Sequence, residues 1–200
     1  PSTDHTNQTI RWVDCHDKVP ELLVPELNLT DTTFPGNLPS NLFCGEMDVP
    51  IDYTKPFDTA TNNITIGFVM NRPPKTASGL IFYHAGGPGE NAAAQAWANA
   101  LNISSAFFGL EDVDFLAINT RGIQLSNPLN LSSVTHSPKR IHSPTTQDKF
   151  DQYQAAMTNF YSAAINDSTP AGIMEHVGTI AVIQDWDSVR AVLGYEKVSF

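Results

Sequence analysis

The apolar run Leu80–Tyr83 ends directly in HAGGPG, residues 84–89, and this junction constrains the fold more than any other part of the chain. A short, wholly apolar run bounded by turn residues is typical of a strand covered on both faces, as in a parallel sheet. Glycine loses more backbone freedom on folding than any other residue, so three glycines in six positions are costly. The cluster indicates either a tight turn or a place where bare backbone faces a reacting group.

Strand and helix patterns alternate along the rest of the chain. Apolar alternation or continuous apolar runs predict strands at 46–51, 64–70 and 113–118. Alanine content or apolar spacings of three and four predict helices at 91–101, 148–165 and 175–193, and Gly194 is placed to end the last of these. Residues 126–147 are expected to form a loop, and 197–200 begin another apolar run. We therefore expect an α/β fold with a mostly parallel sheet that starts with antiparallel strands.

Residues 1–44 are expected to form an N-terminal arm, because four prolines interrupt any regular pattern there. Cys15 and Cys44 are the only cysteines of the sequence, and an even number is compatible with one disulfide that ties this arm down. Such a bond would add about 3 kcal/mol of stability by restricting the unfolded chain. Two buried free thiols are the alternative. Residues 45–200 would then form the α/β region.

Charge and glycosylation motifs bear on partners and compartment. A net charge of −10 argues against nucleic acid and disfavours an anionic membrane surface, and no apolar stretch approaches the roughly 20 residues that span a bilayer. The sequon Asn-x-Ser/Thr occurs six times, which exceeds the roughly two or three expected by chance from the composition. We expect a secreted protein, extracellular or vacuolar, with N-linked glycans drawn from Asn7, Asn28, Asn63, Asn102, Asn130 and Asn166.

The glycines after 80–83 could serve two kinds of chemistry. Phosphate binding is disfavoured, because GGPG matches neither GxGxxG nor a P-loop with its following Lys-Ser/Thr. The other chemistry is an oxyanion hole, which α/β-hydrolases build from backbone N–H groups in a loop after an early strand. A side chain there would keep a substrate carbonyl from reaching the amide. A tight turn without chemistry remains the alternative.

Three further stretches carry a resemblance. They read FCGEMDVPIDYTKP (43–56), VDFLAINTRGIQLSNP (113–128) and DWDSVRAVLGYEKVSF (185–200). With GGPG at 86–89, in this order and spacing, residues 43–200 resemble the N-terminal part of the proline iminopeptidase and tripeptidyl aminopeptidase family. These are serine exopeptidases with the α/β-hydrolase fold. The resemblance implies no metal and no cofactor.

The same resemblance assigns roles to particular residues. Gly87 matches the glycine whose amide forms part of the oxyanion hole, and Gly86, Pro88 and Gly89 shape that loop. Arg121 and Gly122 match a turn that lies close to the loop and supports it. Asp185 and Arg190 match the helix that leads into the nucleophile strand, and Phe200 falls in that strand. The chain departs from the family pattern at Asn119, where Asp is usual, at Gln124, where Gly is usual, and at Glu90-Asn91, where small residues are usual.

The nucleophile itself is absent from the 200 residues, because they contain no Gly-x-Ser-x-Gly, and the triad Asp and His normally follow it. Of the histidines, His84 abuts the glycine loop, His136 and His142 are expected in the polar loop, and His176 at a helix start. None is expected to replace the triad, and Ser199 is expected to be a sheet residue. The 200-residue chain alone is therefore expected to be inactive.

Three functions follow for the complete protein. The first is a secreted serine exopeptidase that releases single residues to tripeptides from peptide N-termini, with its Ser-His-Asp triad supplied by the missing C-terminal half, as a continuation or a second chain. The second is a secreted esterase-type hydrolase, since a fold does not fix a function. The third is a non-catalytic glycoprotein or subunit.

Overall fold

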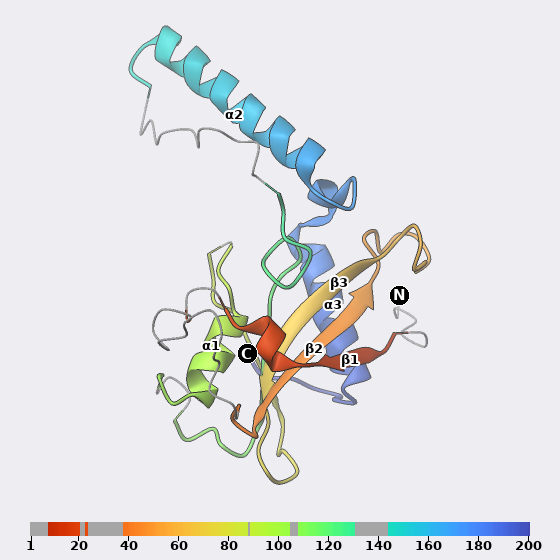
Figure 1. Ribbon diagram of the computed structural model, residues 1–200. Helices are drawn as coiled ribbons and strands as arrows, with labels where there is room; N and C mark the ends of the chain where they lie inside the picture. The colour runs from red at the N-terminus through yellow and green to blue at the C-terminus, as the bar shows by residue number, and fades with distance from the viewer. Residues whose placement is uncertain (1–7, 21–22, 24–37, 88, 105–107, 131–143) are drawn as a thin grey trace.

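A five-stranded sheet forms the centre of the described structure, which is a computed structural model covering residues 8–20, 23, 38–87, 89–104, 108–130 and 144–200 (Figure 1). The strand order is β1-β2-β3-β5-β4. The strands are β1 (Ile10–Val13), β2 (Leu42–Val49), β3 (Ile64–Asn71), β4 (Leu80–Tyr83) and β5 (Asp114–Ile118). The helices are α1 (Ala93–Ala100), α2 (Gln147–Asp167) and α3 (Thr179–Val192), with 3-10 turns η1 (Cys15–Lys18) and η3 (Ile173–His176).

The sheet is mixed, and the expectation of a mostly parallel sheet is wrong for the described residues. The pairs β1–β2, β2–β3 and β3–β5 are antiparallel, as expected at the start of the sheet, while β4 and β5 are parallel. The reason is that β5 returns between β3 and β4, so the crossover β4–α1–β5 supplies the one parallel pair described. Ile81 also forms a parallel bridge with Ser199, so the parallel part continues on the far side of β4.

Helices cover both faces of the sheet. Because successive side chains of a strand point to opposite faces, each central strand contributes to two separate apolar clusters. On β3, Val69 faces the cluster that includes Trp97 of α1, whereas Phe68 and Met70 face the cluster that includes Val189 of α3. Strand β5 alternates in the same way. Its five residues are all buried. The arrangement is consistent with the α/β fold expected from the alternating patterns.

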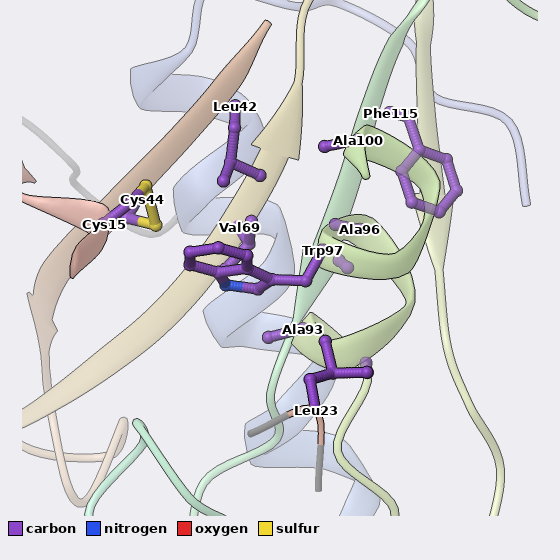
Figure 2. Packing of buried hydrophobic residues seen from close by; sticks show 12 residues of the cluster. Cys15, Leu23, Leu42, Cys44, Val69, Ala93, Ala96, Trp97, Ala100 and Phe115 are labelled. Atoms are coloured by element: carbon purple, nitrogen blue, oxygen red, sulfur yellow. A yellow bond between two sulfur atoms is a disulfide. The ribbon is translucent and has the colours of Figure 1, made fainter. Parts of the chain in front are cut away.

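A disulfide joins Cys15 and Cys44 on the face of the sheet that α1 covers (Figure 2), and their Cα atoms lie 5.3 Å apart. The sulfur atoms lie in the same cluster as Trp97, which is fully buried. Helix α1 turns mainly alanines toward the sheet, and their small side chains leave room for the indole. The predicted disulfide is confirmed, and it fastens the segment after β1 to strand β2.

The N-terminal region contains regular structure that was not expected. Strand β1 pairs with β2, where Ile10 faces Met47 and Val13 faces Cys44. Its sequence IRWV gave little signal, because its two middle side chains are exposed. The 44/45 limit of the expected arm falls inside β2. The division of the chain into an arm and an α/β region stays a prediction.

The predicted helices differ from the observed ones in two ways. The stretch 175–193 is divided, because η3 ends at His176 and Gly178, in an extended conformation, precedes α3. Helix α2 forms as expected but extends away from the sheet (Figure 1), and of its described residues Ala164 is the one that is buried. Phe150 of its apolar stripe is exposed, and so is Ile165.

The predicted loop at 126–147 contains neither helix nor strand up to residue 130, and residues 131–143, with His136 and His142, lie outside the described part. Among the described helices, none combines the length and the apolar character needed to cross a bilayer.

Candidate active site

The glycine loop, residues 84–89, begins where β4 ends. Backbone φ is +88° at Gly86, +105° at Gly87 and +108° at Gly89, a region that residues with a Cβ atom rarely adopt. A Cβ atom on Gly87 would lie 2.7 Å from the backbone nitrogen of Gly89, so the loop folds tightly on itself at this point. Pro88 lies outside the described residues. The loop conformation therefore requires glycine, as both interpretations of its sequence predicted.

A cavity of about 470 Å³ opens beside this loop. Strands β4 and β5 are parallel, so the residues that follow them meet at the same edge of the sheet, and Thr120 lines the cavity together with Gly86 and Gly87. This edge is where open α/β sheets bind ligands. The opposite wall comes from the start of α3 and the residues before it: Val177, Thr179, Val182, Ile183 and Trp186.

His84 lines the cavity and is exposed. Its Nδ1 accepts a hydrogen bond from the backbone N–H of Gly86 at 3.0 Å, and its ring lies 5.4 Å from that of Trp186, centroid to centroid. The imidazole thus links the glycine loop to α3. Groups of three or more His, Cys, Asp or Glu able to hold a metal ion do not occur within the described ranges.

Arg121, in the turn after β5, is buried and uses all five of its N–H donors. Nε and Nη2 donate to the two carboxylate oxygens of Asp185, at 2.8 and 2.6 Å. The remaining N–H groups of the guanidinium donate to three backbone carbonyls at 2.7–3.0 Å, those of Pro50, Ile51 and His176. This one side chain therefore joins the end of β2, the turn after β5, η3 and α3.

Tyr53 completes this buried cluster. Its hydroxyl donates to Asp185 Oδ1 at 2.8 Å, and its ring lies 5.5 Å from the guanidinium carbon of Arg121. Burial raises the pKa of Tyr53, and the neighbouring charge of Asp185 raises it further. Burial also raises the pKa of Asp185, against the opposing hydrogen bonds from Arg121 and Tyr53. The cluster unites residues from three of the four stretches that carried the resemblance.

The described hydrogen bonds of Arg121 do not include the glycine loop, and its support of that loop, with Gly122, stays a prediction. Arg121 bonds instead to His176, at the end of η3, and to Asp185 of α3, and the opposite wall of the cavity lies between these two positions and at Trp186. Gly122 has φ +88°, and a Cβ atom there would lie 3.3 Å from Val177 Cγ1 and 3.2 Å from Leu129 Cγ. Gly122 thus allows the turn to pack closely against Val177, which lines the cavity.

A hydrogen-bonded group of amide side chains joins the end of the glycine loop to the turn after β5. Asn119 Oδ1 accepts from the N–H of Ala93 at 3.0 Å, and Nδ2 donates to Asn91 Oδ1 at 2.9 Å and to the carbonyl of Gln124. Asn91 Nδ2 donates to Gln124 Oε1 at 2.9 Å. The sequence marked these positions as departures from a pattern, but their spacing gave no sign that they contact one another.

Other predicted residues lie away from the cavity. Arg190 donates to Asp187 at 2.7 Å and to the carbonyl of Tyr195, so it fixes the segment after α3. Among the sequons, Asn63 is half-buried with its Oδ1 enclosed, and Asn7 and Asn28 lie outside the described residues. The remaining three are exposed: Asn102, Asn130 and Asn166.

Comparison with known proteins gives distant relatives that are named as peptidases. Over 198 residues, 96% of this chain, it is 23% identical to serine protease Hip1 of Mycobacterium bovis and of Mycobacterium tuberculosis. Over 170 residues, 82% of this chain, it is 25% identical to tripeptidyl aminopeptidase of Streptomyces lividans. These likenesses support a serine peptidase.

The matched region is a limited part of each relative. It covers 34% of the Hip1 proteins and 31% of the Streptomyces aminopeptidase, so the chain spans about a third of the length of the curated relatives it matches. No protein-family model matches the chain. The relatives therefore support a hydrolase of the serine peptidase class.

Proposed function

We propose that this chain is the N-terminal part of a secreted serine exopeptidase that releases single residues to tripeptides from peptide N-termini. The observation that carries the proposal is the glycine loop. Gly86, Gly87 and Gly89 adopt positive φ at the carboxyl end of a parallel strand, beside a cavity with a largely apolar wall. The relatives named serine protease and tripeptidyl aminopeptidase support the same reaction class.

In this mechanism the backbone N–H of Gly87 holds the negative charge that develops on the carbonyl oxygen of the scissile bond. Such a donor contributes about 2.7–4 kcal/mol to transition-state stabilisation, because it is fixed before the reaction and acts where water is excluded. A serine, with its histidine and acid, would come from the part of the protein outside these residues and attack the carbonyl carbon. Arg121 and its partners would hold the apolar wall in place against the substrate.

The test is Gly87→Val in the full-length protein, assayed on aminoacyl and tripeptidyl substrates and on a simple ester. The new side chain cannot keep a φ of +105° without strain, so the amide must turn. We expect kcat to fall by about 10²–10³, with the fold retained by circular dichroism. The ester separates an esterase, which would cleave it and leave peptides intact, from the proposed exopeptidase.

Gly79→Val is the matched control. Gly79 precedes the same strand at its other end, its φ is not in the left-handed region, and a Cβ atom there meets nothing within 4 Å. Its activity should equal that of the unmodified protein. Full activity of Gly87→Val would reduce the three glycines to a turn and would contradict the proposal.

A further inference from the structure

The glycine loop has few contacts of its own among the described residues. The space where a Cβ atom of Gly86 or Gly89 would lie is open, and the polar contact described for the loop backbone is the bond from Gly86 N–H to the exposed His84. A Cβ atom added to Gly87 would lie 2.7 Å from the backbone nitrogen of Gly89 and 3.2 Å from that of Glu90, so the backbone of these two residues folds back beside Gly87. The position of Gly87 therefore depends on where the chain immediately after it is held.

That chain is held at Asn91. Helix α1 begins after Ala92, whose side chain cannot cap it, so its first N–H groups need other acceptors. Asn91 Oδ1 accepts from the N–H of Ala94 at 3.3 Å, and Asn119 Oδ1 accepts from the N–H of Ala93 at 3.0 Å. Two asparagine side chains thus accept the hydrogen bonds that a capping side chain would otherwise accept, and one of them, Asn119, directly follows β5.

These two bonds also fix which way each amide faces. Because Asn119 Oδ1 accepts a hydrogen bond from a backbone N–H, Asn119 Nδ2 is directed at the carbonyl of Gln124 and at Asn91 Oδ1. In the same way, Asn91 Nδ2 is directed at Gln124 Oε1, 2.9 Å away. Each of these bonds joins an amide nitrogen to an oxygen, with Asn119 fully buried and Gln124 exposed at the outer end of the group.

We infer that Asn91, Asn119 and Gln124 are positioning residues that hold the glycine loop against the turn after β5 and so fix the backbone N–H of Gly87. The inference rests on the proposed function, since it assigns these residues a part in placing the oxyanion donor. They touch neither substrate nor nucleophile in this role. They act through Gly89 and Glu90, whose backbone lies beside Gly87.

Gln124 offers the sharpest test, because it is exposed and its replacement should leave the fold intact. In the full-length protein, Gln124→Met removes the acceptor for Asn91, whereas Gln124→Glu keeps a carboxylate oxygen in its place. We expect Gln124→Met to lower kcat by about fivefold with little change in KM, the size of one lost hydrogen bond, and Gln124→Glu to restore it. Gln152→Met is the control, because Gln152 also bonds one side chain, Asp148, but lies on α2.

Amide hydrogen exchange of residues 84–94 supplies a readout that needs no activity. Exchange should be faster in Gln124→Met than in the unmodified protein, in Gln124→Glu and in Gln152→Met. Unchanged exchange, or faster exchange with unchanged kcat, would overturn the positioning role. Full activity of Gly87→Val would instead overturn the proposed function, so the two failures are distinguishable.

Discussion

Arg121→Met should be far more damaging than its size suggests, because it removes one partner of a buried ion pair. The carboxylate of Asp185 would keep the hydroxyl of Tyr53 as its described donor, and three backbone carbonyls would lose theirs. Both charged side chains are almost fully buried, at 0% and 1% exposure. Breaking such a pair from one side costs about 3–5 kcal/mol, since an unpaired charge remains out of water.

The chain contains a matched control in Arg11→Met. Arg11 also makes a two-point bond to a carboxylate, from Nη1 and Nη2 to Asp48 at 2.7 and 2.9 Å. Its side chain is 45% exposed, so water can replace the lost partner. Exposed pairs contribute about 0.2–1 kcal/mol. The loss of unfolding free energy should therefore be larger in Arg121→Met than in Arg11→Met by at least about 2 kcal/mol.

Urea unfolding of the full-length protein, followed by circular dichroism, measures both variants against the unmodified protein. The slope of free energy against urea should stay constant, so that the midpoints report stability alone. Activity of Arg121→Met should fall with its stability, because the wall of the cavity is held by this residue. Equal losses in the two variants, or a loss below about 1 kcal/mol for Arg121→Met, would refute the argument from burial.

Three further outcomes follow from the structure. Alkylation under denaturing, non-reducing conditions should label neither Cys15 nor Cys44, and labelling of both would contradict the disulfide. Enzymatic deglycosylation of protein from its native source should lower the mass in steps and identify occupied sites at the exposed sequons Asn102, Asn130 and Asn166. An unchanged mass would refute secretion through the glycosylation machinery. The guanidinium of Arg11 lowers the pKa of Asp48 below its ordinary 3.8, so the pair stabilises the fold above that pH and loses this effect as pH falls through the folded-state value. The difference in unfolding free energy between the unmodified protein and Asp48→Asn should therefore shrink from pH 7 to about pH 3, and a constant difference would exclude the pair as its source.

The elements that the sequence predicted well are those with strong local patterns. Strand β4 matches its four-residue apolar run, and β5 and α2 differ from the predicted bounds by one or two residues. The division of 173–192 was missed because Val177 and Ile180 continue the helical spacing across Gly178, and spacing alone does not show a local break. The spacing of apolar residues predicted helix α2, but periodicity carries no information on whether a partner covers the apolar stripe, and most of it is not buried.

The site was predictable where it depends on backbone and not where it depends on long-range contacts. The need for glycine at 86, 87 and 89 could be inferred from composition and the preceding strand. The partners of Arg121 could not, because three of them are backbone carbonyls, which have no signature in a sequence, and they lie more than fifty positions away. Asn91, Asn119 and Gln124 were noticed separately, and only the fold brings their amides together.

The strand order has a consequence for how the chain folds during synthesis. Strands β1, β2 and β3 can pair as they emerge, but β4 has β5 and Ser199 as its described neighbours, and both are synthesised later. At about 5–20 residues per second, the ribosome needs about 2–7 s after Tyr83 to complete β5. During that interval the run Leu80–Tyr83 is an unpaired apolar segment, the kind that chaperones bind and that aggregates when they do not. The strand that carries the glycine loop is thus the last of the five to find its partners.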